Sequence, residues 1–130
     1  MPVKTQFTLS ITNKPGSLAE LCNKLARKKV NIEAIAVVEG RDFGTVQIIA
    51  SPAAATRTVL RSSGLAFSTD EVVITEMPNE PGMLACTADK LHQAGLNVDY
   101  LYSTSHGEYT TLVAHVSDPK KASKLLKSCC

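Results

Sequence analysis

The sequence is poor in aromatic residues and has no tryptophan. Only 5% of its 130 residues are aromatic, whereas RNA-binding modules commonly stack bases on aromatic side chains of their central strands. Neither sign of charge dominates, because the formal net charge is +2, and so small a charge creates no global field that attracts nucleic acid. We therefore expect no nucleic-acid partner.

Long apolar runs are also missing. The longest extends only from Ala34 to Val38, far short of the ~20 residues that a membrane-spanning helix needs. The N-terminal residues enter an alternating pattern directly, without the apolar segment of a signal peptide. These features predict no membrane partner and a cytoplasmic location.

The four cysteines form no Cys-x-x-Cys motif. Cys22 and Cys86 fall within helical patterns, and Cys129 and Cys130 end the sequence. Scattered cysteines without a secretory context are expected to be reduced thiols rather than a disulfide framework. The terminal pair is accompanied by no phosphate-binding loop of a prenylated GTPase, so we interpret it as exposed thiols.

Groups for catalysis or metal binding do not converge in the sequence. The histidines His92, His106 and His115 lack a ligand spacing such as His-x-x-x-His. No set of nucleophile, base and oxyanion donors can be assembled, and His115 has no neighbour that is predicted to orient it. The sequence predicts a protein that is not an enzyme, with no metal site and no cofactor.

An internal repeat dominates what the sequence does contain. Residues 13–19 read NKPGSLA, and residues 79–85, which lie 66 positions later, read NEPGMLA. Asn31 meets Asn97 at the same offset, and after a one-residue insertion Pro52 corresponds to Pro119. Such a series of matched positions predicts two equivalent modules. We place them at residues 1–68 and 69–130.

Both halves start with a strand and a helix. Phe7, Leu9 and Ile11 alternate with polar residues, which is typical of a half-buried strand. After each Asn-x-Pro-Gly stretch, apolar residues recur at helical spacing, over 18–26 and over 84–91. Gly95 then stands where a glycine commonly ends a helix.

Two strands and a second helix are predicted next in each half. The strand pairs are 32–38 with 45–50 and 98–103 with 110–116, and the first pair turns at 40–42. Ser51 and Asp118 are predicted helix N-caps, each followed by a proline at the first helical position. Residues 65–67 are predicted to close the first half, almost directly before the strand 71–77. The last helix, 120–127, ends the second half.

This order of elements predicts an α+β fold of two ferredoxin-like βαββαβ modules. We expect their antiparallel sheets to pair side by side with the helices on one face. The second module lacks an evident fourth strand, which leaves a sheet edge that should be covered. The sequence therefore predicts a homodimer.

The Asn-x-Pro-Gly loops, together with Asn31 and Asn97, resemble the ACT domain, the amino-acid-sensing module of metabolic regulators. The resemblance covers residues 5–127 and is to the small stand-alone tandem ACT proteins of bacteria and archaea. It implies that an amino-acid effector binds at the seam between the two modules. Carried over to this sequence, it implies two sites, made of Asn13, Gly16, Leu18 and Asn97, and of Asn79, Gly82, Leu84 and Asn31.

The chemistry of these loops suits an amino acid. Glycine at the start of a helix lets the backbone approach a ligand closely, and unpaired first-turn amides favour a carboxylate. The ammonium group needs acceptors, which the asparagine oxygens and the strand-edge carbonyls near Ile32 and Val98 offer. Tight turns also use Asn, Pro and Gly, and the repeat favours a binding loop over a turn alone.

The side chain of the ligand is predicted from the surrounding residues. Serine-sensing family members carry a histidine two positions before the loop asparagine, where this sequence has Ile11 and Met77. Together with Leu18, Met83 and Leu84, these residues indicate an aliphatic or thioether side chain if they line the site rather than the core.

The sequence thus predicts a regulator that senses a free amino acid at the interface between ACT modules. Coupling to a partner or to its own assembly would work through unequal affinity for two packing states. The alternative is a subunit that has kept the fold, lost the ligand and binds a separate metabolic enzyme.

Overall fold

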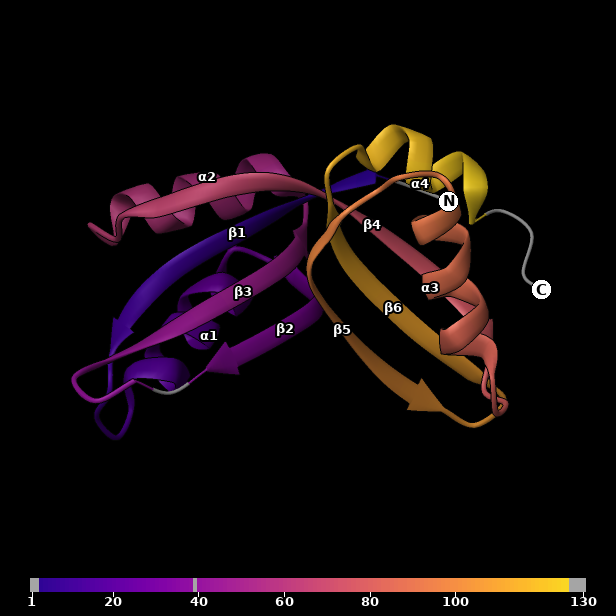
Figure 1. Ribbon diagram of the computed structural model, residues 1–130. Helices are drawn as coiled ribbons and strands as arrows, with labels where there is room; N and C mark the ends of the chain where they lie inside the picture. Colours follow the sequence, from indigo (N-terminus) through magenta and orange to yellow (C-terminus); the bar gives the residue numbers. More distant parts are fainter. Residues whose placement is uncertain (1–2, 39, 127–130) are drawn as a thin grey trace. The chain divides into compact units, whose positions relative to one another are not determined.

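The computed structural model describes residues 3–38 and 40–126, which form six strands and four helices (Figure 1). None of the described helices is long and apolar enough to cross a membrane. In chain order the elements are β1 (Val3–Thr12), α1 (Ser17–Arg27), β2 (Asn31–Val38), β3 (Phe43–Ser51), α2 (Ala53–Ser62), β4 (Phe67–Pro78), α3 (Met83–Gln93), β5 (Val98–His106), β6 (Tyr109–Val116) and α4 (Pro119–Leu125).

The chain divides into two compact units. The first is Thr5–Asp70, and the second contains Glu71 onward together with the first residues of β1. Strand β4 starts in the first unit and continues in the second, so it replaces the two separate strands predicted at 65–67 and 71–77. No glycine or proline lies between Gly64 and Pro78, and the extended chain therefore meets no turn residue that would break it.

The second unit has three strands of its own among the described residues, β4, β5 and β6, so a fourth strand is missing as predicted. Within the first unit the strand order is β2-β3-β1, and within the second it is β4-β6-β5. The predicted open sheet edge and the homodimer argued from it both stay predictions.

In the first unit, α1 and α2 cover one face of the sheet. Phe7 of β1 lies opposite Ile48 of β3, and both side chains are 0% exposed. Alternate strand residues and one stripe of each helix face this core. Its buried members are Phe7, Leu9, Leu21, Leu25, Val30, Val46, Ile48, Ala50, Val59 and Leu60.

The second unit builds the equivalent core from α3, α4, β4 and β6. Its buried members are Val73, Leu91, Ala114, Val116, Ala122 and Leu126. The cap of α4 is confirmed, because the Asp118 carboxylate accepts a hydrogen bond from the Lys121 N–H at 3.1 Å. Lys127, the predicted last residue of this helix, lies outside the described residues.

The predicted cap of α2 is wrong by one residue. Ser51 is the last residue of β3, and Pro52, in an extended conformation with φ −72° and ψ 145°, is the N-cap of a helix that starts at Ala53. Ser51 pairs with Asn31 in the β2–β3 ladder. Because it belongs to the sheet, Ser51 does not act as the N-cap of α2.

The cysteines differ from the prediction at one position. Cys22 is a free thiol, as predicted. Cys86 is disulfide-bonded, so the prediction of a reduced thiol is wrong for this residue. Sequence spacing does not reveal which cysteines a fold brings together. Cys129 and Cys130, interpreted above as exposed thiols, lie outside the described residues.

The first helix of each repeat ends with the same backbone conformation on different residues. After α3, Gly95 has a φ of 73°, and the Leu96 N–H donates to the Leu91 carbonyl at 2.9 Å, which confirms the predicted glycine stop. After α1, Lys29 has a φ of 58° and the same hydrogen bond follows it. A residue with a Cβ adopts this left-handed conformation at a cost of about 1–2 kcal/mol.

We expect Lys29→Gly to stabilise the protein by about 1 kcal/mol, because glycine removes the left-handed penalty but adds entropy to the unfolded chain. Urea unfolding measures the change. The reverse substitution, Gly95→Lys, is the matched control and should destabilise by a similar amount. A loss of stability in Lys29→Gly would contradict the prediction.

Candidate functional site

Each Asn-x-Pro-Gly loop delivers the chain into a helix through a left-handed glycine. Gly16 has a φ of 89° and is the N-cap of α1, and Gly82 has a φ of 86° and is the N-cap of α3. A Cβ at either position would meet no atom within 4 Å. The glycines are therefore required by the backbone conformation and not by crowding.

The first turns of α1 and α3 present open N–H groups. No side chain caps either helix. In the part of the chain that the structure describes, the N–H groups of Gly16, Leu18, Gly82 and Leu84 donate to no protein acceptor. Open donors at the positive end of a helix dipole favour an anionic group such as a carboxylate.

The loop asparagines tie each loop to the neighbouring hairpin. The side-chain NH₂ of Asn13 donates to the Gly40 carbonyl at 2.9 Å, and its backbone N–H donates to the Asp42 carbonyl at 2.8 Å. The NH₂ of Asn79 donates to the Gly107 carbonyl at 3.0 Å in the same way. Each asparagine can therefore offer its side-chain oxygen to a ligand as an acceptor while its NH₂ holds the hairpin.

A pocket of about 200 Å³ opens beside the second loop and contains two of the predicted site residues, Asn79 and Leu84. Met77 and Met83, predicted as apolar lining, also line it. The full lining is Met77, Pro78, Asn79, Glu80, Met83, Leu84, Ser103, Ser105, Thr110 and Leu112. The pocket beside the second loop therefore has both an apolar and a polar wall.

The polar wall comes from the β5–β6 hairpin. Ser105 lies opposite Thr110 in the ladder, and their hydroxyl oxygens are 2.7 Å apart. The Thr110 hydroxyl lies 3.5 Å from the side-chain oxygen of Asn79, to which it donates weakly. Sequence reasoning missed Ser103, Ser105 and Thr110. Their signal was the alternation on β5, which places Ser103 and Ser105 on one face.

Asn97 and Val98, the predicted site residues at the start of β5, lie away from the pocket beside Asn79. Asn97 directly precedes β5, and its side-chain NH₂ donates to Asp99 at 3.2 Å. Val98 pairs with Val116, at the end of β5 opposite to Ser105. Neither residue lines the pocket beside Asn79, and the family resemblance assigns Asn97 to the site of the first loop, which stays a prediction.

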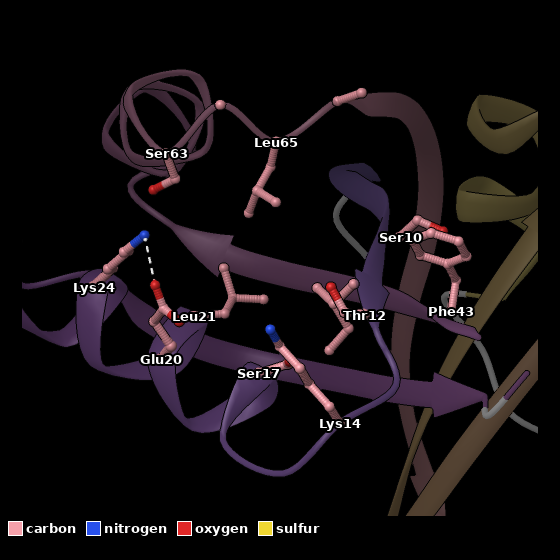
Figure 2. Close-up of a pocket in the computed structure, with 13 residues that line it drawn as sticks. Ser10, Thr12, Lys14, Ser17, Glu20, Leu21, Lys24, Phe43, Ser63 and Leu65 are labelled. Carbon is pink, nitrogen blue, oxygen red and sulfur yellow. Dashed lines mark ion pairs between the residues drawn. The ribbon is translucent and has the colours of Figure 1, made fainter. Parts of the chain in front are cut away.

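In the first unit, Asn31 begins β2 and is exposed, and Ile32 packs against the core. A pocket beside the first loop is lined by Lys14 and Ser17 but not by Asn13, Gly16 or Leu18 (Figure 2). The two loops thus have the same backbone and different surroundings.

His115 has orienting neighbours that the sequence did not predict. Its Nδ1 lies 2.9 Å from a carboxylate oxygen of Asp99, and its ring stacks on that of Tyr100 with centroids 5.0 Å apart. A register shift between Val98 and Tyr100 places Tyr100 opposite His115, so the expectation of an unoriented histidine is wrong. Among the described residues, no three His, Cys, Asp or Glu side chains are grouped to hold a metal ion.

The pKa of one group on β5 is strongly shifted. Burial raises the pKa of Tyr102 from 10.0 to about 12, and the nearby Tyr100 adds to the rise. Burial disfavours the charged phenolate. Tyr102 is therefore a neutral group throughout the physiological range of pH.

Comparison with known proteins adds a family and a fold. A family model described as an ACT domain pair matches residues 1–128. A solved protein from Bacteroides thetaiotaomicron is 30% identical, with 96% of this chain and 87% of that chain covered and a TM-score of 0.88. No curated protein matches the sequence.

Two more distant structures share the fold. The regulatory subunit of aspartate kinase from Thermus thermophilus is 14% identical, with 95% of this chain and 89% of that chain covered and a TM-score of 0.74. The corresponding subunit from Thermus flavus is also 14% identical, with 95% and 88% covered and a TM-score of 0.62. At this identity the likeness shows the fold alone.

Proposed function

Because the chain belongs to the ACT domain pair family, we propose that it is a regulatory, non-catalytic protein that binds a free amino acid at its Asn-x-Pro-Gly loops. The observation that carries this proposal is the pocket beside Asn79. It combines apolar walls, hydroxyl groups and an asparagine oxygen next to the open N–H groups of a helix N-terminus.

Each part of an amino acid has a counterpart at this pocket. The carboxylate would bind the open N–H groups of Gly82 and Leu84. The ammonium would donate to the side-chain oxygen of Asn79 and to the carboxylate of Glu80, which also lines the pocket. A volume of about 200 Å³ lies below the roughly 300 Å³ at which drug-sized pockets begin, so it suits one amino acid better than a nucleotide.

The side chain of the ligand would contact the methionines. Met77 is 4% exposed and forms the base of the apolar wall together with Leu112. Thioether groups adapt to varied apolar shapes. We therefore propose an aliphatic or thioether amino acid as the ligand.

The first loop offers the same backbone chemistry through Asn13, Gly16 and Leu18. That Asn97 and Val98 complete this site, and that Asn31 and Ile32 complete its twin, stays a prediction from the family resemblance. Binding would regulate the protein through unequal affinity for two packing states.

A separate metabolic enzyme is the partner in the alternative function. Solved proteins of the same fold are named regulatory subunits of aspartate kinase, which supports considering an enzyme-bound subunit. Such a subunit would be found with an enzyme and would respond to no amino acid.

Calorimetric titration with the twenty amino acids tests the proposal. We expect heat and a thermal shift with an aliphatic or thioether amino acid, and neither after the double substitution Asn13→Ala and Asn79→Ala. Asn23→Ala, on the exposed side of α1, is the matched control and should bind normally. Absence of heat and of a thermal shift with all twenty amino acids would contradict the proposal and favour the alternative.

A further inference from the structure

A pocket of about 400 Å³ lies in the first unit between α1 and the connection from α2 to β4 (Figure 2). Leu21 of α1 and Leu65 of the connection supply apolar surface from its two sides. Figure 2 shows Lys14 extending into this space from the loop before α1. The pocket thus pairs an apolar lining with a cation.

Lys14 supplies the uncompensated charge of this pocket. The other cation in the lining, Lys24, forms an ion pair with Glu20 at 3.2 Å. Lys14 forms no ion pair with any described residue. The lining therefore presents one net positive charge to a ligand.

Hydroxyl groups next to Lys14 can share in binding an anion. Ser17 and Thr12 line the pocket, and their hydroxyls have no protein partner among the described residues. Ser63, across the pocket, donates its hydroxyl proton to the Val59 carbonyl at 2.8 Å. The hydroxyls of Ser17 and Thr12 are thus available to an anion bound at Lys14. Hydrogen bonds between charged groups and such donors are short and strong.

We propose that this pocket binds a small aliphatic carboxylate. Its carboxylate lies at Lys14, Ser17 and Thr12, and its hydrocarbon part contacts Leu21 and Leu65. An ammonium group on the ligand is not needed, because Glu20 is already paired with Lys24. The site is distinct from the amino-acid site proposed above, since Asn13, Gly16 and Leu18 do not line it.

The repeat itself restricts this site to the first unit. Glu80 occupies the position in the second Asn-x-Pro-Gly loop that Lys14 occupies in the first. A glutamate there repels a carboxylate where the lysine attracts one.

Titration of the full chain with isobutyrate, 4-methyl-2-oxopentanoate and leucine tests the proposal. We expect isobutyrate to bind, and its affinity to fall at least tenfold in Lys14→Gln, because a hydrogen bond to a charged group contributes more than the roughly 1.4 kcal/mol that equals tenfold. Lys14→Arg should restore binding. The exposed Lys28→Gln should leave it unchanged.

Two results would overturn the proposal: no binding of isobutyrate and 4-methyl-2-oxopentanoate to the wild-type chain, or equal isobutyrate affinity in Lys14→Gln. If isobutyrate and 4-methyl-2-oxopentanoate both bind, and both depend on Lys14, the proposal is supported. The ligand that binds most tightly among isobutyrate, 4-methyl-2-oxopentanoate and leucine then identifies the source of the carboxylate. Asn79→Ala separates the two sites, because it should weaken amino-acid binding at the second loop and leave isobutyrate binding intact.

Discussion

Phe7→Ala should destabilise the protein by about 3–5 kcal/mol, as expected when a fully buried aromatic ring is replaced by a methyl group. Phe7 is 0% exposed, and its ring meets that of Phe67 edge-on with centroids 5.6 Å apart. The guanidinium of Arg57 lies 5.7 Å from the centroid of the Phe7 ring. The substitution therefore leaves a cavity and removes two ring contacts at once.

Urea unfolding of Phe7→Ala measures this loss. Val73 occupies the equivalent place in the second repeat and is 1% exposed, so Val73→Ala is the matched substitution. Its loss should be smaller, because fewer buried carbon atoms are removed. A loss of less than about 1 kcal/mol in Phe7→Ala would contradict the structure of the first core.

Gly82→Val should weaken binding of the amino-acid ligand at the second loop on the order of a hundredfold, equivalent to about 2.7 kcal/mol. Gly82 has a φ of 86°, which a β-branched residue adopts only with strain. The new side chain would also stand at the entrance to α3, where a ligand carboxylate must approach the backbone closely. Titration of the variant with the amino acid that binds the wild-type chain measures the loss.

Gly95→Val separates strain from binding. Gly95 has a φ of 73°, and a Cβ there meets no atom within 4 Å, as at Gly82. Both variants should therefore lose a similar amount of stability, about 1–2 kcal/mol. Only Gly82→Val should lose binding. Equal loss of binding in both variants would show that strain alone is responsible.

Local signals in the sequence predicted most of the fold. The alternation in Phe7, Leu9 and Ile11 reports a periodicity that burial imposes on neighbouring residues, so it is visible without tertiary information. The 66-residue offset is visible in the same way, because it compares the sequence only with itself. The stop at Gly95 and the cap at Asp118 are local in the same sense, and the structure confirms both.

Features that depend on distant partners were not predicted. The contact of His115 with Asp99 follows from a register shift in β5, and pairing register is set between strands rather than along one strand. Ser51 is a further case, because its partner in the sheet ladder, Asn31, lies far from it in the sequence. Such contacts leave the spacing of apolar residues along each strand and helix unchanged, so the sequence pattern does not reveal them.

The candidate site was predicted in part for the same reason. Met77, Asn79, Met83 and Leu84 all lie within residues 77–84, and they line one pocket. Ser105 and Thr110 reach this pocket only because β5 and β6 pair in a particular register. The sequence showed Lys14 only as a residue of the first Asn-x-Pro-Gly loop. Its place in a second pocket depends on the connection from α2 to β4, which forms the other side of that pocket.

We propose that a free amino acid binds at the Asn-x-Pro-Gly loop of the second unit. Amide NMR of the full chain during titration with aliphatic and thioether amino acids tests it most directly, because each N–H group reports its own environment. We expect the largest shifts at Gly82, Leu84 and Ser105. Saturating amino acid that moves none of these amides, or only amides of the α2–β4 connection, would contradict it.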